Sequence, residues 1–106
     1  MKLSLIVPAY NEERRIGPML DAYLPFLAQR YGKGDAEVIV VVNGSKDRTA
    51  EVVRSYIDRY PQLKCIEEPA SIGKGGALIR GFKAAIGEFV GFVDADGATP
   101  PEAFQD

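Results

Sequence analysis

The stretch Val38-Ile39-Val40-Val41-Val42 is a nearly unbroken run of β-branched residues. A strand that is apolar at every position is typical of a parallel sheet with both faces covered, because neither face of such a strand meets water. The turn residues Asn43-Gly44-Ser45 follow the run and lead the chain out of the sheet. The stretch therefore predicts a covered strand of a parallel sheet.

Strand and helix patterns alternate along the chain on both sides of this run. The strand patterns cover residues 3–7, 36–42, 63–66 and 88–93, and segments with helical spacing of apolar residues lie between them. Such alternation predicts the α/β fold class. We expect a mostly parallel, Rossmann-like sheet with right-handed crossovers and helices on both faces.

The helical pattern of residues 73–86 begins with glycines, and its spacing predicts a buried face. The residues expected to face the sheet are Leu78, Phe82, Ala85 and Ile86. Gly87 is expected to cap the C-terminus of this helix. After the last strand, Thr99 stands three residues before Glu102 with prolines between them, which is the signature of a capping box at a further helix.

The composition is that of a single globular domain. Of 106 residues, 46% are hydrophobic, and 13 basic against 15 acidic side chains give a net charge of −2. This balance argues against a nucleic-acid partner. No apolar run approaches the roughly 20 residues of a membrane span, so we expect no span in this segment.

Cysteine usage bears on the cellular location of the protein. Cys65 is the only cysteine, which excludes an internal disulfide and fits a reducing compartment. We therefore expect a cytoplasmic protein, which could attach to the cytoplasmic face of a membrane only through parts outside this segment.

The last strand bears on domain organisation. A sheet that ends just after its fourth strand has an uncovered edge, so residues 1–106 look like the N-terminal part of a larger domain.

Two carboxylates follow the last apolar run, at Asp94-Ala95-Asp96. We expect a short buried strand to deliver them to the C-terminal edge of the sheet, where open α/β sheets bind ligands. At a separation of about 6 Å their repulsion is about 3 kcal/mol at an effective dielectric of about 20, and a divalent cation reverses its sign. The pattern predicts a Mg²⁺ or Mn²⁺ site completed by phosphate oxygens. The alternative is an exposed turn in which the aspartates bond backbone amides.

Two further loops follow strands at the same edge and can converge with these carboxylates. Residues 8–13 offer the aromatic ring of Tyr10 to a base and carboxylates to sugar hydroxyls. In the loop of residues 43–49, Gly44 permits close backbone approach. The alternative for this second loop is a turn with Asp47 near the positive end of a helix.

The glycine-rich segment Gly73-Lys74-Gly75-Gly76, with Arg80 a helical turn further on, can bring amides and cations to phosphates. It is not a P-loop, because no lysine precedes Ser or Thr at the required glycine spacing. It is not a GxGxxG fingerprint either, because Leu78 occupies the place of the last glycine. The alternative is a glycine-rich helix start packed close to the sheet.

Taken together, the motifs VPAYNEE, VVVNGSKDRT, GKGGALIRGF and DADGATPPE resemble, in order and spacing, the front half of family-two glycosyltransferases with the GT-A fold. The resemblance covers nearly all of the sequence. The GxGGA loop and the DADGATPPE ending are most similar to polyprenyl-phosphate (dolichyl-phosphate) glucosyl- or mannosyltransferases. The resemblance implies that residues 1–106 form the N-terminal, nucleotide-sugar-binding part of a GT-A domain.

The resemblance also implies roles for individual residues. Pro8, Tyr10 and Glu12 would lie near the nucleoside, Asn43 would touch the base, Asp94 would face the ribose or sugar, Asp96 would hold the metal, and Lys74 and Arg80 would contact the donor. The implied reaction is an inverting transfer of a hexose to an acceptor such as a polyprenyl phosphate. Its catalytic base is expected beyond Asp106, so residues 1–106 alone are expected to bind a donor poorly and to transfer no sugar.

One residue departs from the family pattern. Family members commonly carry an aspartate at the position of Asn43. An amide donates and accepts hydrogen bonds, whereas a carboxylate only accepts them. The uracil edge, with one donor between acceptors, suits an amide, and the adjacent donors of guanine suit a carboxylate. The departure favours a UDP-sugar over GDP-mannose.

Two other functions stay open from the residues. A sugar-phosphate nucleotidyltransferase also uses an α/β sheet and metal-binding acids, but its GxGxR-type loop would follow the first strand, where this chain has VPAYNEE. A non-catalytic nucleotide-binding module is the third possibility.

Overall fold

The computed structural model describes residues 1–32 and 34–95. The elements are β1 (Leu3–Ala9), α1 (Ile16–Tyr31), β2 (Ala36–Asn43), α2 (Thr49–Ile57), β3 (Leu63–Glu68), α3 (Gly73–Ala84) and β4 (Phe89–Phe92). Strand and helix alternate throughout, as the sequence predicts. Within the described ranges, none of the helices combines the length and the apolar character needed to cross a membrane.

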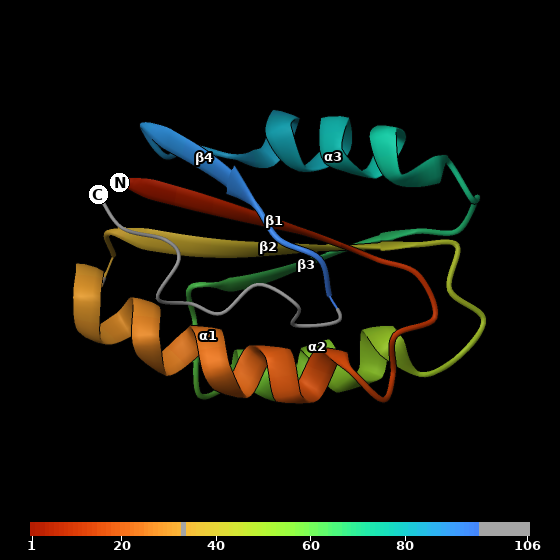
Figure 1. Ribbon diagram of the computed structural model, residues 1–106, viewed down its shortest axis with the longest axis horizontal. Coiled ribbons are helices and arrows are strands. Elements are labelled where there is room, and N and C mark those ends of the chain that lie inside the picture. Colours follow the sequence, from red (N-terminus) through yellow and green to blue (C-terminus); the bar gives the residue numbers. More distant parts are fainter. Residues whose placement is uncertain (33, 96–106) are drawn as a thin grey trace.

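The four strands form one parallel sheet in the order β3-β2-β1-β4. Helices α1 and α2 cover one face and α3 covers the other (Figure 1). The expected parallel sheet with helices on both faces is therefore confirmed. All strands run the same way, so the loops that follow them leave from one edge.

Strand β2 is buried along its whole length. Because side chains alternate between the faces of a strand, its residues divide between two apolar clusters. Val38 and Val40 join β1 residues in the cluster with α1 and α2. Ile39 and Val41 join Ile6 and Ala77 on the side of α3. The predicted covered strand is thus observed.

A buried carboxylate lies on the α3 side of the sheet. Glu37 is fully buried and accepts hydrogen bonds from the Ser4 hydroxyl, the Lys64 ammonium group and the Ile86 amide. Burial acts to raise the pKa of Glu37, but these bonds together hold its pKa below the ordinary value. The Gly87 amide donates to Ser4 Oγ at 2.8 Å. This network fastens the end of α3 to β1 and β2.

The buried face of α3 agrees with the prediction at Leu78 and Ala85, which are half-buried against the apolar cluster on that side, and differs at the two larger residues. Ala77 and Gly81 are buried, whereas Phe82 is 46% exposed and Ile86 is 65% exposed. A Cβ at Gly81 would lie 2.5 Å from Ile6 Cγ2, so the helix lies against the sheet through its small residues. The predicted cap at Gly87 is also wrong, because α3 ends at Ala84 and its C-cap is Ala85, which has an extended conformation.

Strand β4 is not the buried strand that the sequence predicts. Phe89 is 60% exposed and Phe92 is 47% exposed. The strand pairs with β1 and ends the strand order of the described sheet, so its side chains have fewer neighbours than those of β2. Phe92 packs edge-to-face on Phe82 of α3 at a centroid distance of 5.1 Å. The predicted capping box at Thr99 lies outside the described residues.

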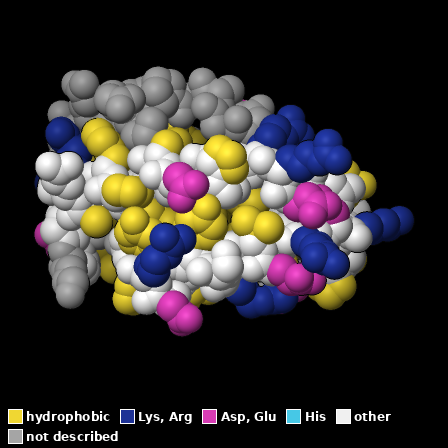
Figure 2. Space-filling model, turned by 90° about the horizontal axis from the view of Figure 1, so that it is seen from below, with side chains coloured by type: hydrophobic (Ala, Val, Ile, Leu, Met, Phe, Trp, Pro, Cys, Tyr) yellow, Lys and Arg dark blue, Asp and Glu magenta, His cyan; other side chains and the backbone are white. Residues whose placement is uncertain are grey.

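The outer face of α1 and α2 carries charges of both signs. In Figure 2, basic and acidic side chains lie interspersed around a patch of apolar side chains. No single sign of charge dominates the part of this face that the structure describes. The face therefore presents a mixed rather than a strongly basic surface.

Candidate functional site

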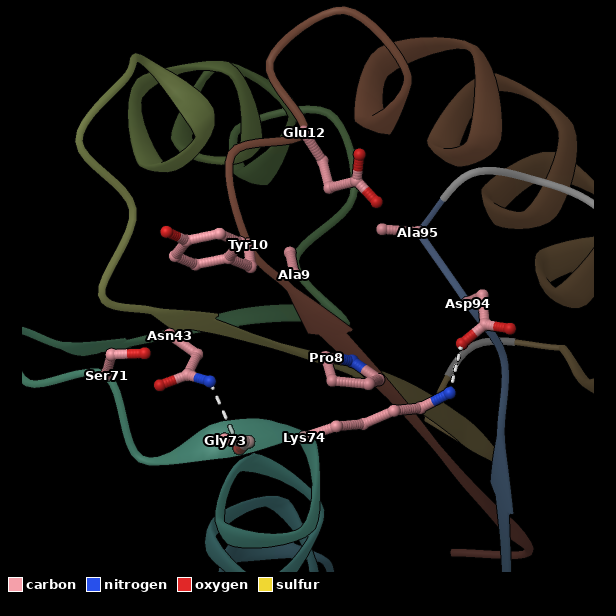
Figure 3. A pocket seen from close by; sticks show the side chains of 10 residues that line it. All are labelled: Pro8, Ala9, Tyr10, Glu12, Asn43, Ser71, Gly73, Lys74, Asp94 and Ala95. Carbon is pink, nitrogen blue, oxygen red and sulfur yellow. Dashed lines mark hydrogen bonds and ion pairs between the residues drawn. The ribbon is translucent and has the colours of Figure 1, made fainter.

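A cavity of about 440 Å³ opens at the edge where the strands end. Its lining comes from four segments that are distant in sequence and close in space (Figure 3). The lining residues are Pro8, Ala9, Tyr10, Glu12, Asn43, Ser71, Gly73, Lys74, Asp94 and Ala95. The carboxyl ends of parallel strands are where open α/β sheets place ligand sites.

Six side chains that the sequence singles out for a donor lie around this cavity. They are Pro8, Tyr10, Glu12, Asn43, Lys74 and Asp94. The loops that follow β1 and β2 and the end of β4 therefore converge, as expected. Tyr10 lines the cavity and is 54% exposed, so its ring is accessible to a planar ligand.

Asn43 connects β2 to the segment that starts α3. Its Nδ2 donates to the Gly73 carbonyl at 3.1 Å, and its Oδ1 accepts from the Ile72 amide at 2.8 Å. The side chain points to the α3 side because it shares the alternation of Ile39 and Val41. Asn43 thus holds the glycine-rich segment beside the cavity, which is a role that the sequence analysis did not foresee.

Gly44 allows the same segment to come close. A Cβ at this position would lie 2.9 Å from Ser71 Cα, so a larger residue would push the two loops apart. Its φ of 64° also favours glycine. The expected close backbone approach is confirmed, and its partner is Ser71.

The far wall of the cavity is an ion pair. Lys74 Nζ lies 2.8 Å from Asp94 Oδ1, and the two side chains are 65% and 55% exposed. An exposed pair of this kind contributes about 0–1 kcal/mol. An anion that enters the cavity can therefore replace Asp94 as a partner of Lys74 at small cost.

Glu12 supplies a second carboxylate from the opposite side. Its side chain is 15% exposed and forms an ion pair with Arg15. Glu12 Oε1 is buried and forms the ion pair with Arg15, and it accepts no hydrogen bond in the part of the chain that the structure describes. Glu12, in the loop after β1, and Asp94, which follows β4, both line the cavity (Figure 3).

The described residues offer part of a metal site. No group of three or more acidic, histidine or cysteine side chains suited to a metal occurs in residues 1–32 and 34–95. Mg²⁺ usually takes one or two carboxylates and completes its shell with water and substrate phosphates. Asp94 fits one such ligand, because its carboxylate lines the cavity. Asp96 lies outside the described residues.

Arg80 is not brought to the cavity. Its guanidinium donates to Glu68 Oε2 at 2.7 Å, and Arg80 is absent from the lining. Glu68 ends β3, so the cation is held over the neighbouring strand. The geometry gives Arg80 a structural contact in place of the expected donor contact.

Sequence reasoning missed Ser71 in the loop after β3. The glycine-rich segment at Gly73 and Lys74 was expected to contact phosphates, but the loop that precedes it was not among those expected to converge. The signal was present, because β3 is parallel to its neighbours and must end at the same edge. Ala9 and Ala95 were missed because a small apolar side chain carries no chemical signature.

Comparison with known proteins agrees with this geometry. The sequence profile named Glycosyl transferase family 2 matches residues 4–106. The dolichyl-phosphate beta-glucosyltransferase ALG5C of Trichomonas vaginalis is 42% identical over 106 residues, covering 97% of this chain and 32% of that protein. The chain thus spans about a third of the length of the curated relatives it matches.

Solved structures match the fold as well. The S. aureus TarS 1–349 complex with UDP-GlcNAc superposes with a TM-score of 0.80 at 37% identity, covering 91% of this chain and 27% of that one. The mannosyltransferase PcManGT from Pyrobaculum calidifontis, in complex with GDP-Man and Mn²⁺, gives a TM-score of 0.79 at 36% identity, covering 90% and 27%. Both are GT-A glycosyltransferases, which confirms the expected fold. Since the family profile also covers nearly the whole sequence, the chain belongs to glycosyl transferase family 2.

Proposed function

We propose that this chain is the nucleotide-sugar-binding part of a hexosyltransferase that uses a UDP-sugar donor and an acceptor such as a polyprenyl phosphate. One observation carries the proposal: six side chains with donor-binding chemistry line one cavity of about 440 Å³. That volume is within the range of about 300–1,000 Å³ typical of ligand pockets. The acceptor class is supported by the names of relatives such as ALG5C.

The nucleoside would lie between the first two loops. Tyr10 offers its exposed ring to the base, with Pro8 beside it in the lining. The bonds of Asn43 to Ile72 and Gly73 use one N–H and one lone pair of the amide. The amide keeps a second donor and a second acceptor, which suits the edge of uracil. This supports a UDP-sugar over GDP-mannose.

The diphosphate would lie at Lys74. Its ammonium group turns from Asp94 to the phosphate oxygens, which leaves the Asp94 carboxylate for the ribose or sugar hydroxyls. Asp96, with Asp94, is our proposed ligand of Mg²⁺ or Mn²⁺. When bound, the metal would neutralise charge on the leaving diphosphate.

The proposed reaction is an inverting displacement. The acceptor oxygen bonds to the anomeric carbon as the bond between that carbon and the diphosphate breaks. Lys74 stabilises the charge that develops on the leaving group. The catalytic base is expected beyond Asp106, so residues 1–106 alone should hold a donor weakly and transfer no sugar.

Calorimetry tests this proposal. We expect UDP-glucose to bind more tightly than GDP-mannose, and Mn²⁺ to strengthen binding. Asp96→Ala should abolish the increase in donor affinity caused by Mn²⁺, and Asp94→Asn should make that increase smaller. If neither nucleotide sugar binds at millimolar concentration, or if the Asp96→Ala variant responds to Mn²⁺ like the wild type, the proposal is wrong.

A further inference from the structure

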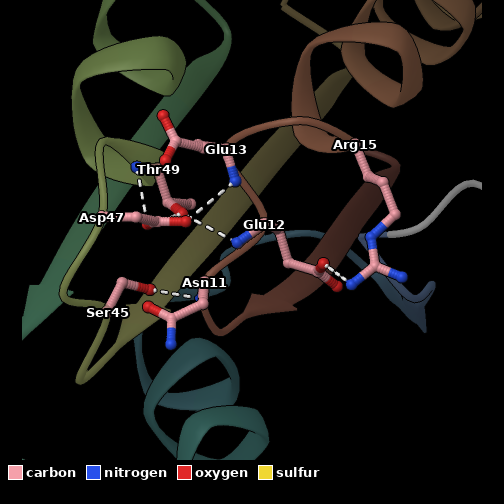
Figure 4. A network of polar contacts seen from close by, with 7 residues as sticks. All are labelled: Asn11, Glu12, Glu13, Arg15, Ser45, Asp47 and Thr49. Carbon is pink, nitrogen blue, oxygen red and sulfur yellow. Dashed lines mark hydrogen bonds and ion pairs between the residues drawn. The ribbon is translucent and has the colours of Figure 1, made fainter.

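The loop between β1 and α1 is held by side chains of residues 45–49, which form a second loop that leads from β2 into the first residue of α2 (Figure 4). Three successive amides of the first loop donate to three side chains of the second. Asn11 N lies 2.9 Å from Ser45 Oγ, Glu12 N lies 2.9 Å from Thr49 Oγ1, and Glu13 N lies 3.2 Å from Asp47 Oδ2. The bonds join residues more than 30 positions apart in sequence.

The contact is reciprocal at Asn11. Its Oδ1 accepts from the Lys46 amide at 2.8 Å, while its own amide is bound by Ser45. Asn11 has a φ of 51°, the one positive φ of a non-glycine residue in the described parts of the chain. Such a conformation is uncommon and needs support from its surroundings. The second loop supplies that support.

The side chains of the second loop also hold one another. The Thr49 hydroxyl donates to Asp47 Oδ1 while it accepts from Glu12, and the Thr49 amide donates to the same Asp47 oxygen at 3.0 Å. Burial acts to raise the pKa of Asp47, but these bonds and the Glu13 amide hold its pKa below the ordinary value. Asp47 therefore stays charged at neutral pH and accepts charge-assisted bonds.

This network lies behind the cavity and not in it. Tyr10 and Glu12, on either side of Asn11, line the cavity, whereas Ser45, Asp47 and Thr49 do not. The three side chains therefore do not contact a ligand in this cavity directly, and their hydrogen bonds lead to the first loop, which does line it. Ordering a mobile loop on binding costs conformational entropy and weakens affinity. A loop that is already fixed before the ligand binds avoids this cost, so the ligand binds more tightly.

We propose that Ser45, Asp47 and Thr49 are positioning residues for the donor, which fix Tyr10 and Glu12 in the conformation that receives the nucleoside. This inference rests on the proposed function. It extends the function to residues that touch no ligand. The motif NGSKDRT would then do more than start α2, because its alternate residues Ser45, Asp47 and Thr49 accept hydrogen bonds from the amides of a loop distant in sequence.

Thr49→Val tests the inference most cleanly, because valine keeps the shape and removes the hydroxyl. We expect faster hydrogen exchange at the Glu12 amide and about a tenfold rise in the Kd for UDP, which corresponds to about 1.4 kcal/mol. Thr49→Ser keeps the oxygen and should restore both values. Ser55→Ala is the matched control, because it removes a hydroxyl from the same helix, where Ser55 Oγ donates to the Val52 carbonyl.

Exchange and affinity are measured by NMR on the folded chain at millimolar UDP. If Thr49→Val does not fold, Ser45→Ala removes the bond to Asn11 and carries the same expectations. Wild-type affinity in a folded variant whose Glu12 amide exchanges fast would overturn this inference alone. An equal loss of UDP affinity in Thr49→Ser and Thr49→Val would also overturn this inference. A wild-type chain that binds no nucleotide would overturn the proposed function and this inference with it.

Discussion

Lys74 and Arg80 are cations on one helix with different surroundings. Lys74 lines the cavity, whereas Arg80 is bonded to Glu68 outside it. We expect Lys74→Ala to raise the Kd for UDP about tenfold, because a charge-assisted bond to phosphate contributes about 1.5–3 kcal/mol and the exposed site screens part of it. Arg80→Ala is the control and should leave the Kd unchanged. Calorimetry measures both Kd values. A larger loss of UDP affinity in Arg80→Ala than in Lys74→Ala would reverse our assignment of the two cations.

Glu37 makes stability depend on pH. Because its folded-state pKa is lowered, its stabilisation is fully present above the unfolded pKa of about 4.3 and is lost as pH falls through the folded value. We expect Glu37→Gln to lower the free energy of unfolding at pH 7 by about 1–3 kcal/mol and to flatten the loss of stability in acid. Urea titrations across the acid range measure this.

The exposed residue Glu51 provides the control for that experiment. Glu51→Gln should leave the acid limb of the stability curve as it is in the wild type. An equally steep acid limb in Glu37→Gln would show that other carboxylates cause the loss.

Asn43 illustrates what the sequence could predict for single residues. The turn after the run at 38–42 placed its side chain at the sheet edge, and the structure puts it in the cavity lining. Its partners Ile72 and Gly73 were not predictable from spacing, because they depend on how closely a separate loop approaches. The polar side chain of Asn43 at a strand end indicated a site, whereas its hydrogen-bond partners depend on tertiary packing.

At the scale of elements, Gly81 decides how α3 lies on the sheet. A Cβ at this position would lie 2.5 Å from Ile6 Cγ2. We expect Gly81→Ala to destabilise the fold by about 1–3 kcal/mol, because the helix or Ile6 must move. Gly75→Ala is the matched control on the same helix, since a Cβ there meets nothing within 4 Å. It should be neutral or stabilise by up to about 1 kcal/mol.

Thermal and urea unfolding of the two variants give these values. Equal stability of Gly81→Ala and Gly75→Ala would contradict the close packing of α3 on β1. The cavity lies at the other end of the helix from Gly81, so a stable Gly81→Ala protein should bind UDP as the wild type does.

The elements themselves differ in how far the sequence predicted them. The β-branched run in β2 predicted burial on both faces, because its apolar residues occupy both phases of the alternation. For α3, large apolar residues at 82 and 86 suggested the buried face, but the helix packs through Ala77 and Gly81. A prediction from hydrophobic spacing favours residues with a large apolar surface. It therefore misses helix faces whose small residues allow the helix to pack close to the sheet.

At the scale of the whole molecule, the chain spans about a third of the length of the relatives it matches. We expect the purified 106-residue chain to transfer no glucose from UDP-glucose to dolichyl phosphate, because the catalytic base is expected beyond Asp106. A radiolabelled transfer assay measures this, with a full-length dolichyl-phosphate glucosyltransferase as the positive control. Transfer above the enzyme-free background would contradict the expectation.

The central claim is that the cavity at the strand ends receives a nucleoside diphosphate. Its most direct test is an NMR titration of the isotope-labelled chain with UDP-glucose and Mg²⁺. We predict that amide signals of Tyr10, Asn43, Lys74 and Asp94 shift together, while those of Lys2 and Glu88 at the opposite edge stay in place. Shifts gathered around Arg54 and Glu67, which line a different cavity, or no shifts at millimolar ligand, would contradict the account.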